Sequence, residues 1–250
     1  MSTHRFAGRD GADLTYIDTG AGRPLILVHG FLGTGSHMLG PGPGRALAEQ
    51  GYRVVLPDLR GHGDSSKSHD ITAYPPDVLA DDGLALIDHL GFGDGDYDLG
   101  GYSFGARVVV RMLARGARPG RAIVAGQGLA KVSGPQGDES RRMLVALIDG
   151  TPLDPGSPAG RMAGWLSQLG GDPQALVNVV DSLVPTSADE LRRITVPTLV
   201  AIGAQDERSD ADELAALLPG SRFVRVPGDH DGALTAPELA TEIAAFLAER

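Results

Sequence analysis

The chain has 250 residues, of which 42% are hydrophobic and 22% charged, so we expect one large folded domain with an insertion. Its formal net charge of −10 at pH 7 argues against phosphate backbones and anionic membrane surfaces as partners. It has no cysteine, which excludes a disulfide framework, a thiolate zinc site and a cysteine nucleophile.

Short aliphatic runs alternate with helical patterns along most of the chain. Residues 12–18 alternate in polarity, as an antiparallel edge strand would, and residues 4–7 are expected to pair with them. After this hairpin we expect, in chain order, strands at 24–28 and 52–57, a helix at 77–90, a strand at 97–102, a helix at 103–115, strands at 121–125 and 197–202, a helix at 210–218, a strand at 222–226 and a helix at 237–249. Thr235 is the expected N-cap of the last helix, with Pro237 in its first turn. This order predicts an α/β fold, with a mostly parallel, twisted sheet of about eight strands flanked by helices.

Glycine and proline interrupt this pattern between about residues 128 and 186. Short helices fit between them at 139–148, 159–169 and 173–183. A disordered linker is the alternative, but the spacing of Met143, Leu144, Leu147 and Ile148 favours an amphipathic helix. We therefore predict a helical cap over residues 129–186, inserted into a core formed by residues 1–128 and 187–250.

A serine lies between two glycines in the stretch Gly-Tyr-Ser-Phe-Gly-Ala, residues 101–106. A strand, then Gly-x-Ser-x-Gly, then a helix is the pattern of a nucleophile elbow. Gly101 and Gly105 would leave room for neighbouring backbones, and the start of the helix would favour a developing negative charge near Ser103. With 36 glycines in the chain, the alternative is an ordinary glycine turn with a solvent-facing serine.

A nucleophilic serine needs a base, and the base needs an orienting acid. Where this elbow occurs, the acid and then the histidine follow the serine. His230 is the one histidine downstream of Ser103, and we expect it in a loop between the last strand and the last helix. Asp206 follows the strand at 197–202 and is the expected acid. The neighbouring Glu207, Asp210 and Asp212 fit a solvated helix start.

A tetrahedral oxyanion needs two N–H donors. One is expected from the backbone of Phe104, directly after the serine, and the other from Phe31, in the loop after the strand at 24–28. His29 precedes this loop and could be mistaken for a base. We expect its ring to bond loop backbone instead.

Four segments in order resemble the α/β-hydrolase fold superfamily, in its branch of small cofactor-free serine esterases, lactonases and perhydrolases. They are His29-Gly30-Phe31, the stretch from Pro57 to Ser65, the elbow at Ser103, and Val196-Pro197-Thr198-Leu199 leading to Asp206 and His230. The resemblance implies structural roles for Arg60 and His62. A serine in place of aspartate argues against the epoxide-hydrolase and haloalkane-dehalogenase branches. The two acids beside His230, Asp229 and Asp231, depart from the family's usual pattern; they would stabilise the imidazolium or face water.

The expected function is hydrolysis of a small, mainly apolar carboxylic ester or lactone, through a Ser-His-Asp triad and an acyl-enzyme. Two alternatives stay open: a C–C bond hydrolase or secondary-metabolism tailoring enzyme on the same triad, and a non-catalytic ligand-binding protein. Trp165 in the cap would line an apolar substrate pocket or pack the cap onto the core. Arg141, Arg142 and Arg161 would meet a substrate carboxylate or face water.

The expected partner is a small-molecule substrate, with no nucleic acid and no membrane. No metal cluster or dinucleotide fingerprint is present, so no metal and no cofactor is expected. No apolar run approaches the roughly 20 residues of a membrane helix, and residues 1–6 lack the apolar stretch of a signal peptide. We therefore expect a cytoplasmic protein, and a homodimer is one alternative for its oligomeric state.

Overall fold

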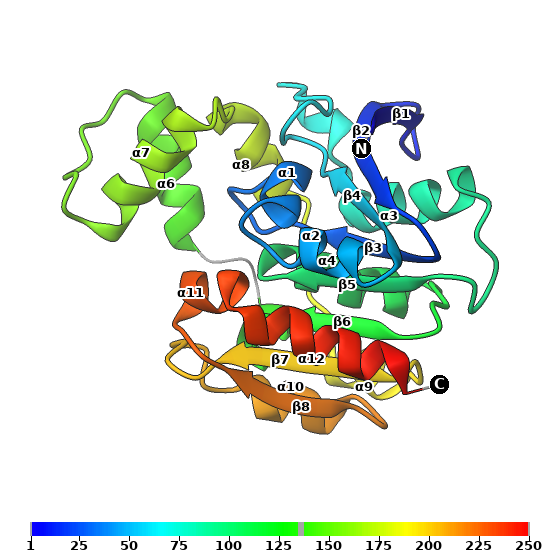
Figure 1. The fold of residues 1–250 in the computed structure, drawn as a ribbon. Helices are drawn as coiled ribbons and strands as arrows, with labels where there is room; N and C mark the ends of the chain where they lie inside the picture. Colours follow the sequence, from blue (N-terminus) through cyan, green and yellow to red (C-terminus); the bar gives the residue numbers. More distant parts are fainter. Residues whose placement is uncertain (1, 135–137, 250) are drawn as a thin grey trace.

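An eight-stranded sheet with helices on both faces forms the body of the molecule in a computed structural model that describes residues 2–134 and 138–249 (Figure 1). The strands are β1 (Ser2–Ala7), β2 (Asp13–Gly20), β3 (Arg23–Val28), β4 (Tyr52–Asp58), β5 (Asp98–Tyr102), β6 (Ala122–Ala125), β7 (Thr198–Gly203) and β8 (Arg222–Val226), in the order β1-β2-β4-β3-β5-β6-β7-β8. β1 and β2 pair antiparallel, β2 also runs antiparallel to β4, and all pairings from β4 to β8 are parallel. The predicted mostly parallel sheet and its N-terminal hairpin are confirmed.

Twelve α-helices and a 3-10 turn connect the strands of the described residues. They are α1 (Gly35–Leu39), α2 (Gly44–Glu49), η1 (Ile71–Ala73), α3 (Val78–His89), α4 (Phe104–Ala114), α5 (Leu129–Ser133), α6 (Asp138–Ile148), α7 (Pro158–Gln168), α8 (Pro173–Asp181), α9 (Ala188–Arg192), α10 (Ala211–Leu217), α11 (His230–Thr235) and α12 (Pro237–Ala248). Within the described ranges, none of these helices is long and apolar enough to cross a membrane.

The central strands β3 to β7 are buried on both faces of the sheet, as their continuous aliphatic sequences require. In β3, Ile26 and Val28 belong to one apolar cluster with residues of α3, α4 and α10. Their neighbours Leu25 and Leu27 belong to a second cluster with residues of α1, α2 and α12. The two-residue period of a strand therefore divides the core into two layers.

The expectation for the start of the last helix was wrong. Ala236, not Thr235, is the N-cap of α12, while Thr235 ends the additional short helix α11. This helix forms because the Asp229 side chain accepts the Gly232 N–H and so caps its first turn. His230 therefore begins a helix and does not lie in an extended loop.

The segment between β6 and β7 is largely helical, as predicted. α6 packs on α7 and α8 through an apolar cluster whose fully buried members include Met143, Leu144 and Leu166. Phe31 and Leu32, from the loop after β3, pack against the same cluster. Figure 1 shows α6 and α7 beyond the edge of the sheet, on the side where α11 lies. The predicted boundaries, 129 and 186, include residues 135–137, which lie outside the described residues, as do the end residues 1 and 250 of the predicted core.

Two buried arginines of α4 connect this helix to both ends of the segment. Arg107 donates to carbonyl oxygens at the end of α5. Arg111 pairs with Asp77 at the start of α3, and the Asp77 N–H donates to the carbonyl of Ser182, directly after α8. Asp77 has a left-handed backbone with φ of 66°, an uncommon conformation outside glycine that aspartate and asparagine tolerate best.

We expect Asp77→Asn to lower the free energy of unfolding by about 3 kcal/mol, because it removes the carboxylate that accepts from two nitrogens of the buried Arg111 guanidinium and leaves it only the Glu190 carboxylate. The side chains of Asp77 and Arg111 are only 7% and 9% exposed, and asparagine keeps the size and backbone preference of aspartate. Urea unfolding curves measure the loss. Asp189→Asn is the matched control, since its pair with Arg192 is exposed and its loss should stay below about 0.5 kcal/mol. Equal losses in the two variants would contradict the prediction.

Candidate active site

Ser103 lies at the turn between β5 and α4, where it is the N-cap residue of the helix. Its backbone has φ of 55° and ψ of −118°, and Asp77 is the one other non-glycine residue with positive φ in the described ranges. Such a conformation costs free energy and persists only where the surroundings enforce it. The Ser103 N–H donates to the carbonyl of Ala125 in the adjacent strand β6, at 2.8 Å, which fixes the turn.

The two glycines around the serine allow three backbones to meet. A Cβ on Gly101 would lie 2.4 Å from the carbonyl carbon of Gly105. A Cβ on Gly105 would lie 2.3 Å from the carbonyl oxygen of Val28, at the end of β3. Neither position accepts a side chain unless α4 moves away from the sheet. The sharp elbow predicted from the sequence is therefore present, and the simple solvent-facing turn is not.

The structure brings Ser103, His230 and Asp206 together. His230 Nε2 lies 2.9 Å from Ser103 Oγ, and His230 Nδ1 lies 2.7 Å from Asp206 Oδ2. Asp206 follows β7, and His230 begins α11 after β8. The Tyr102 hydroxyl donates to the carbonyl oxygen of His230 and so ties α11 to β5. Burial raises the pKa of Tyr102, which keeps this hydroxyl a donor.

Asp206 is the carboxylate that contacts His230, and its side chain is fully buried. Burial acts to raise its pKa, but hydrogen bonds from His230 and from the Arg208 backbone, with the charges of both residues, lower the pKa to about 2. Asp206 is therefore ionised at neutral pH. Glu207 is exposed, as expected for a solvated helix start.

The expectation that Asp210 lies at a solvated helix start needs correction. Asp210 is the N-cap residue of α10, but its carboxylate accepts the N–H of Ala130 at 2.6 Å. A Cβ on Gly128 would lie 1.9 Å from this carboxylate, so the contact requires glycine there. Asp210 thus fixes the start of α5. The acids beside the histidine, Asp229 and Asp231, are both exposed.

The two expected N–H donors lie on either side of the serine. Phe104 directly follows Ser103, and a Cβ on Gly30 would lie 3.6 Å from the Ser103 Cβ, which brings the Gly30–Phe31 peptide next to the serine. Among the described residues, neither the Phe31 nor the Phe104 N–H has a hydrogen-bond acceptor. Both donors are therefore available to a bound group.

His29 fixes the orientation of the Gly30–Phe31 peptide. The Leu59 N–H donates to Nε2 of His29, at 3.0 Å, so the ring proton is on Nδ1, which donates to the Gly30 carbonyl at 2.8 Å. Burial and the neighbouring His62 lower the pKa of His29 to about 3, so the ring is neutral. Since the Gly30 carbonyl and the Phe31 N–H belong to one planar peptide, holding the carbonyl aims the N–H the opposite way. The expectation that the His29 ring bonds loop backbone is confirmed.

Arg60 and His62 make structural contacts, in agreement with the resemblance. Arg60 is buried and pairs with Asp10 and Asp82. Nε2 of His62 lies 2.6 Å from the carbonyl oxygen of Phe31. Nδ1 of the same ring lies 3.0 Å from the carbonyl oxygen of Arg60. Burial lowers the pKa of His62, so the neutral ring donates to one of these two carbonyls and packs beside the loop.

Sequence reasoning missed three residues that support the site. Gln127 donates from Nε2 to the carbonyl oxygen of Ser103, at 3.0 Å, and Tyr102 contacts His230 as described. Arg208 donates from Nη1 to Asp206, at 3.1 Å. All three follow or end strands at the same edge of the sheet, and that position is the one signal by which the sequence marks them.

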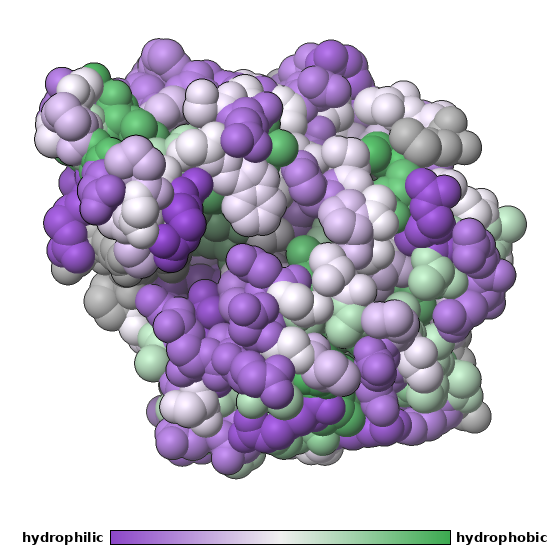
Figure 2. Space-filling view, turned by 60° about the vertical axis from the view of Figure 1, so that its left-hand side comes forward, coloured by the Kyte–Doolittle hydropathy of each residue, from purple (hydrophilic) through white to green (hydrophobic). Residues whose placement is uncertain are grey.

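The helical segment places Trp165 on α7 with 44% of its surface exposed, while the adjacent Leu166 is buried in the cluster with α6 and α8. Arg141 pairs with Asp181 inside this segment, and Arg161 donates to the carbonyl oxygen of Gly156. Figure 2, which turns this side of the molecule forward, shows a recess beneath the protruding helices with hydrophobic surface inside it.

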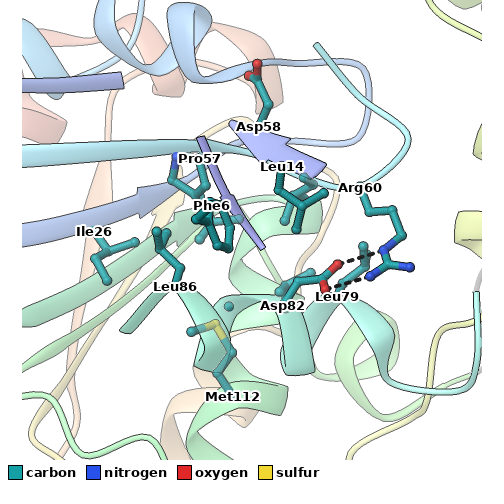
Figure 3. Close-up of a pocket in the computed structure, with 14 residues that line it drawn as sticks. Phe6, Leu14, Ile26, Pro57, Asp58, Arg60, Leu79, Asp82, Leu86 and Met112 are labelled. Carbon is teal, nitrogen blue, oxygen red and sulfur yellow. Dashed lines mark hydrogen bonds and ion pairs between the residues drawn. The ribbon is translucent and has the colours of Figure 1, made fainter. Parts of the chain in front are cut away.

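A buried cavity of about 20 Å³ lies elsewhere, between the sheet and helices α3 and α4 (Figure 3). Its lining is mostly apolar and includes Phe6, Leu14 and Met112, with the Arg60–Asp82 ion pair at its rim. Its volume leaves room for about one water molecule, and its lining contains none of the residues around Ser103. It is a packing void and not the reaction site.

Comparisons with known proteins agree with this geometry. A family model described as the alpha/beta hydrolase fold matches residues 23–125. A curated relative, a non-heme haloperoxidase of Rhodococcus erythropolis, is 29% identical over 90% of this chain and 92% of its own length.

Two solved structures superpose on nearly the whole chain. A thermophilic esterase from Thermogutta terrifontis has a TM-score of 0.78 and 25% identity, covering 99% of this chain and 98% of its own. A bromoperoxidase from Bacillus anthracis, at 22% identity, has a TM-score of 0.77 and covers 99% of this chain and 100% of its own, and so supports the fold alone. The sheet order, the match of residues 23–125 and these likenesses agree, and the chain has the α/β-hydrolase fold.

Proposed function

We propose that this chain is a serine hydrolase that cleaves a small, mainly apolar carboxylic ester or lactone. The proposal rests on two consecutive hydrogen bonds, which connect Ser103 Oγ through the His230 ring to the buried Asp206 carboxylate. In such an arrangement the imidazole can take a proton from the hydroxyl while the carboxylate stabilises the resulting positive charge. The esterase likeness agrees with this reaction class.

Acylation begins when Ser103 Oγ attacks the ester carbonyl carbon as its proton passes to His230 Nε2. The carbonyl oxygen becomes an oxyanion, which accepts the N–H groups of Phe31 and Phe104. When the tetrahedral intermediate collapses, the C–O bond to the alcohol breaks and the imidazolium protonates the departing oxygen. Asp206 stays ionised throughout and holds the His230 ring.

Deacylation repeats these steps with water. Water gives a proton to His230 Nε2 as its oxygen attacks the acyl carbon, and the new oxyanion uses the same two N–H donors. The bond to Ser103 Oγ then breaks, Oγ recovers the proton and the carboxylic acid leaves. Every group required belongs to this chain, so the mechanism needs no cofactor.

The apolar character of the substrate is inferred from the surroundings of the loop after β3, which supplies the Phe31 N–H. Phe31 and Leu32 pack against the apolar cluster of α6, α7 and α8, which includes Met162. We propose that residues 129–186 act as a cap on the site, excluding water while the oxyanion forms and shaping the acyl pocket. A C–C bond hydrolase on the same triad is the rival, and activity on a diketone without activity on p-nitrophenyl esters would favour it.

Peracid formation is a second candidate, favoured by the haloperoxidase relative that covers 90% of the chain. In this reaction hydrogen peroxide replaces water in the attack on the acyl-enzyme. The bond to Ser103 Oγ breaks, and a peracid leaves in place of the acid. Release of peracetic acid from an acetate ester in the presence of hydrogen peroxide would identify this activity.

Covalent labelling by a fluorophosphonate tests the proposed function, with the modified residue located by mass spectrometry. We expect labelling at Ser103 in the wild type and none in Ser103→Ala. Folded wild-type protein that is never labelled would overturn the proposal. Ser103→Ala and His230→Ala should each lower kcat on p-nitrophenyl esters by roughly 10⁴- to 10⁶-fold, and the double variant should lose little more. Losses that multiply would mean that the residues do not act together.

Within the same series, Asp206→Asn should lower kcat less than loss of Ser103, because the imidazole remains but its orientation and charge stabilisation are weakened. Glu207→Gln is the matched control, since this carboxylate is exposed beside Asp206. A greater loss in Glu207→Gln than in Asp206→Asn would overturn the acid assignment.

The role of His29 gives a separate expectation. Glutamine at this position reaches toward Leu59 and removes the side-chain donor from the Gly30 carbonyl, whereas asparagine keeps an N–H near the place of Nδ1. His29→Gln should therefore lower kcat by about tenfold, less than the loss of a whole oxyanion donor, because the Gly33 N–H still bonds this carbonyl. His29→Asn should stay within about threefold of the wild type. Equal losses in the two variants, both with wild-type melting temperatures, would contradict an action through the Gly30–Phe31 peptide.

Trp165→Ala tests the cap. We expect KM for aromatic and long-chain esters to change about fivefold relative to that for an acetate ester, through lost apolar contact with the substrate. Labelling of Ser103 by a small fluorophosphonate should hardly change. Ile71→Ala, at another exposed apolar residue outside the predicted cap, is the control. Lower stability with an unchanged ester preference would mean that Trp165 only packs the cap.

A further inference from the structure

The buried acid of the site has a second cationic partner. Oδ2 of Asp206 contacts His230, while Oδ1 accepts both the backbone N–H of Arg208, at 3.0 Å, and its guanidinium Nη1, at 3.1 Å. The Asp206 side chain is fully buried and that of Arg208 is 19% exposed. One carboxylate thus connects a permanent cation to the imidazole that becomes a cation during the proposed reaction.

The two bonds from Arg208 restrain how the carboxylate can turn. Both donors belong to Arg208, only two positions after Asp206, and both bond the same carboxylate oxygen. The two hydrogen bonds and the short backbone between these residues therefore form closed rings. Among the described residues, Arg208 Nε is buried without a hydrogen-bond partner, so Asp206 is what anchors the guanidinium. With Oδ1 occupied, Oδ2 stays directed at His230.

Arg208 also changes the charge around the imidazole. The Tyr102 ring lies 5.5 Å from the His230 ring, and among the described residues the charges that act on Tyr102 are the carboxylates of Asp206, Asp229 and Asp231 and the guanidinium of Arg208. Asp229 and Asp231 are exposed and therefore screened. Arg208 and His230 bond the same carboxylate, so the guanidinium lies within about one Debye length of the imidazole ring (about 8 Å at physiological ionic strength). Part of the repulsion between the guanidinium and the imidazolium therefore remains.

We propose that Arg208 is a positioning residue of the triad: it holds Asp206 Oδ1 so that Oδ2 stays on His230, and its charge makes the imidazolium release its proton at a lower pH. The inference rests on the proposed function, because it assigns Arg208 an effect on the general base of that reaction. It predicts that His230 acts as a base at lower pH with Arg208 than without it.

Two substitutions separate charge from position. Arg208→Gln removes the charge and keeps an N–H donor, while Arg208→Lys keeps the charge and loses the planar guanidinium. The second-order rate of Ser103 labelling by a fluorophosphonate is measured between pH 5 and 9. The acidic limb is the pH range in which this labelling rate falls as the pH is lowered. In Arg208→Gln we expect this limb to lie about half to one pH unit higher than in the wild type, because removing a cation favours the imidazolium.

Arg208→Lys should keep the acidic limb of the wild type. Its pH-independent labelling rate, the plateau, should be lower because lysine positions the Asp206 carboxylate less well. The control Arg192→Gln, at an exposed arginine paired with Asp189, should keep both limb and plateau. An acidic limb of Arg208→Gln that is unchanged or moves down would overturn the proposal, even if the plateau falls, because that is the result of a purely structural role.

A second measurement keeps this result independent of turnover. The ring protons of His230, assigned by their absence in His230→Gln, are titrated by NMR in the wild type and in Arg208→Gln. An upward shift of the titration midpoint in Arg208→Gln supports the charge effect, and an equal midpoint overturns it. Absence of labelling in the wild type would overturn the proposed function but leave this comparison valid. If Arg208→Gln does not fold, Arg208→Met provides the second neutral variant.

Discussion

The strained backbone at Ser103 is the constraint on which the rest of the site depends. A positive φ at a serine costs on the order of 1–3 kcal/mol, and the neighbouring strands offset this cost. The Ser103 N–H is bonded to Ala125, and the close approach of β3, β5 and α4 at Gly101 and Gly105 leaves the turn no other path. The same turn that raises the hydroxyl above the sheet leaves the Phe104 N–H without a protein acceptor.

Parallel strand pairing then brings the other parts of the site to this turn. The Gly30–Phe31 peptide follows β3, Asp206 follows β7 and His230 follows β8, so all three leave the sheet at the edge where β5 ends. Ser103 and His230 are 127 positions apart in the chain, yet their side chains are in hydrogen-bond contact because the sheet fixes both ends. The His29 ring, which holds the Gly30–Phe31 peptide, is itself held by the backbone N–H of Leu59.

Local patterns in the sequence predicted the strands and the elbow, since each is signalled by its immediate neighbours, and chain order then selected Asp206 and His230. Aliphatic runs mark the strands, and two glycines mark Ser103. The helices α1, α2, α5 and α11 were not foreseen because 5 or 6 residues are too few to show a helical period. Arg208 and the partners of His29 were missed for a different reason: what these side chains contact is decided by loops that meet only after folding.

The proposed division between core and cap explains why the sequence indicates a reaction more clearly than a substrate. All polar contacts among Ser103, Asp206 and His230 lie in the core, and the family match over residues 23–125 ends before α5 begins. The helices α6 and α7 pack on each other or on α8, and reach the core loop at Phe31 and Leu32 through apolar contacts. Apolar contacts tolerate exchange of side chains of similar volume more readily than hydrogen-bonded pairs do. Under the proposed function, residues of α6 and α7 can therefore change the shape of the acyl pocket while the hydrogen bonds from Ser103 to Asp206 keep their geometry. The proposed chemistry and the choice of substrate would then rest on physically separate parts of one chain.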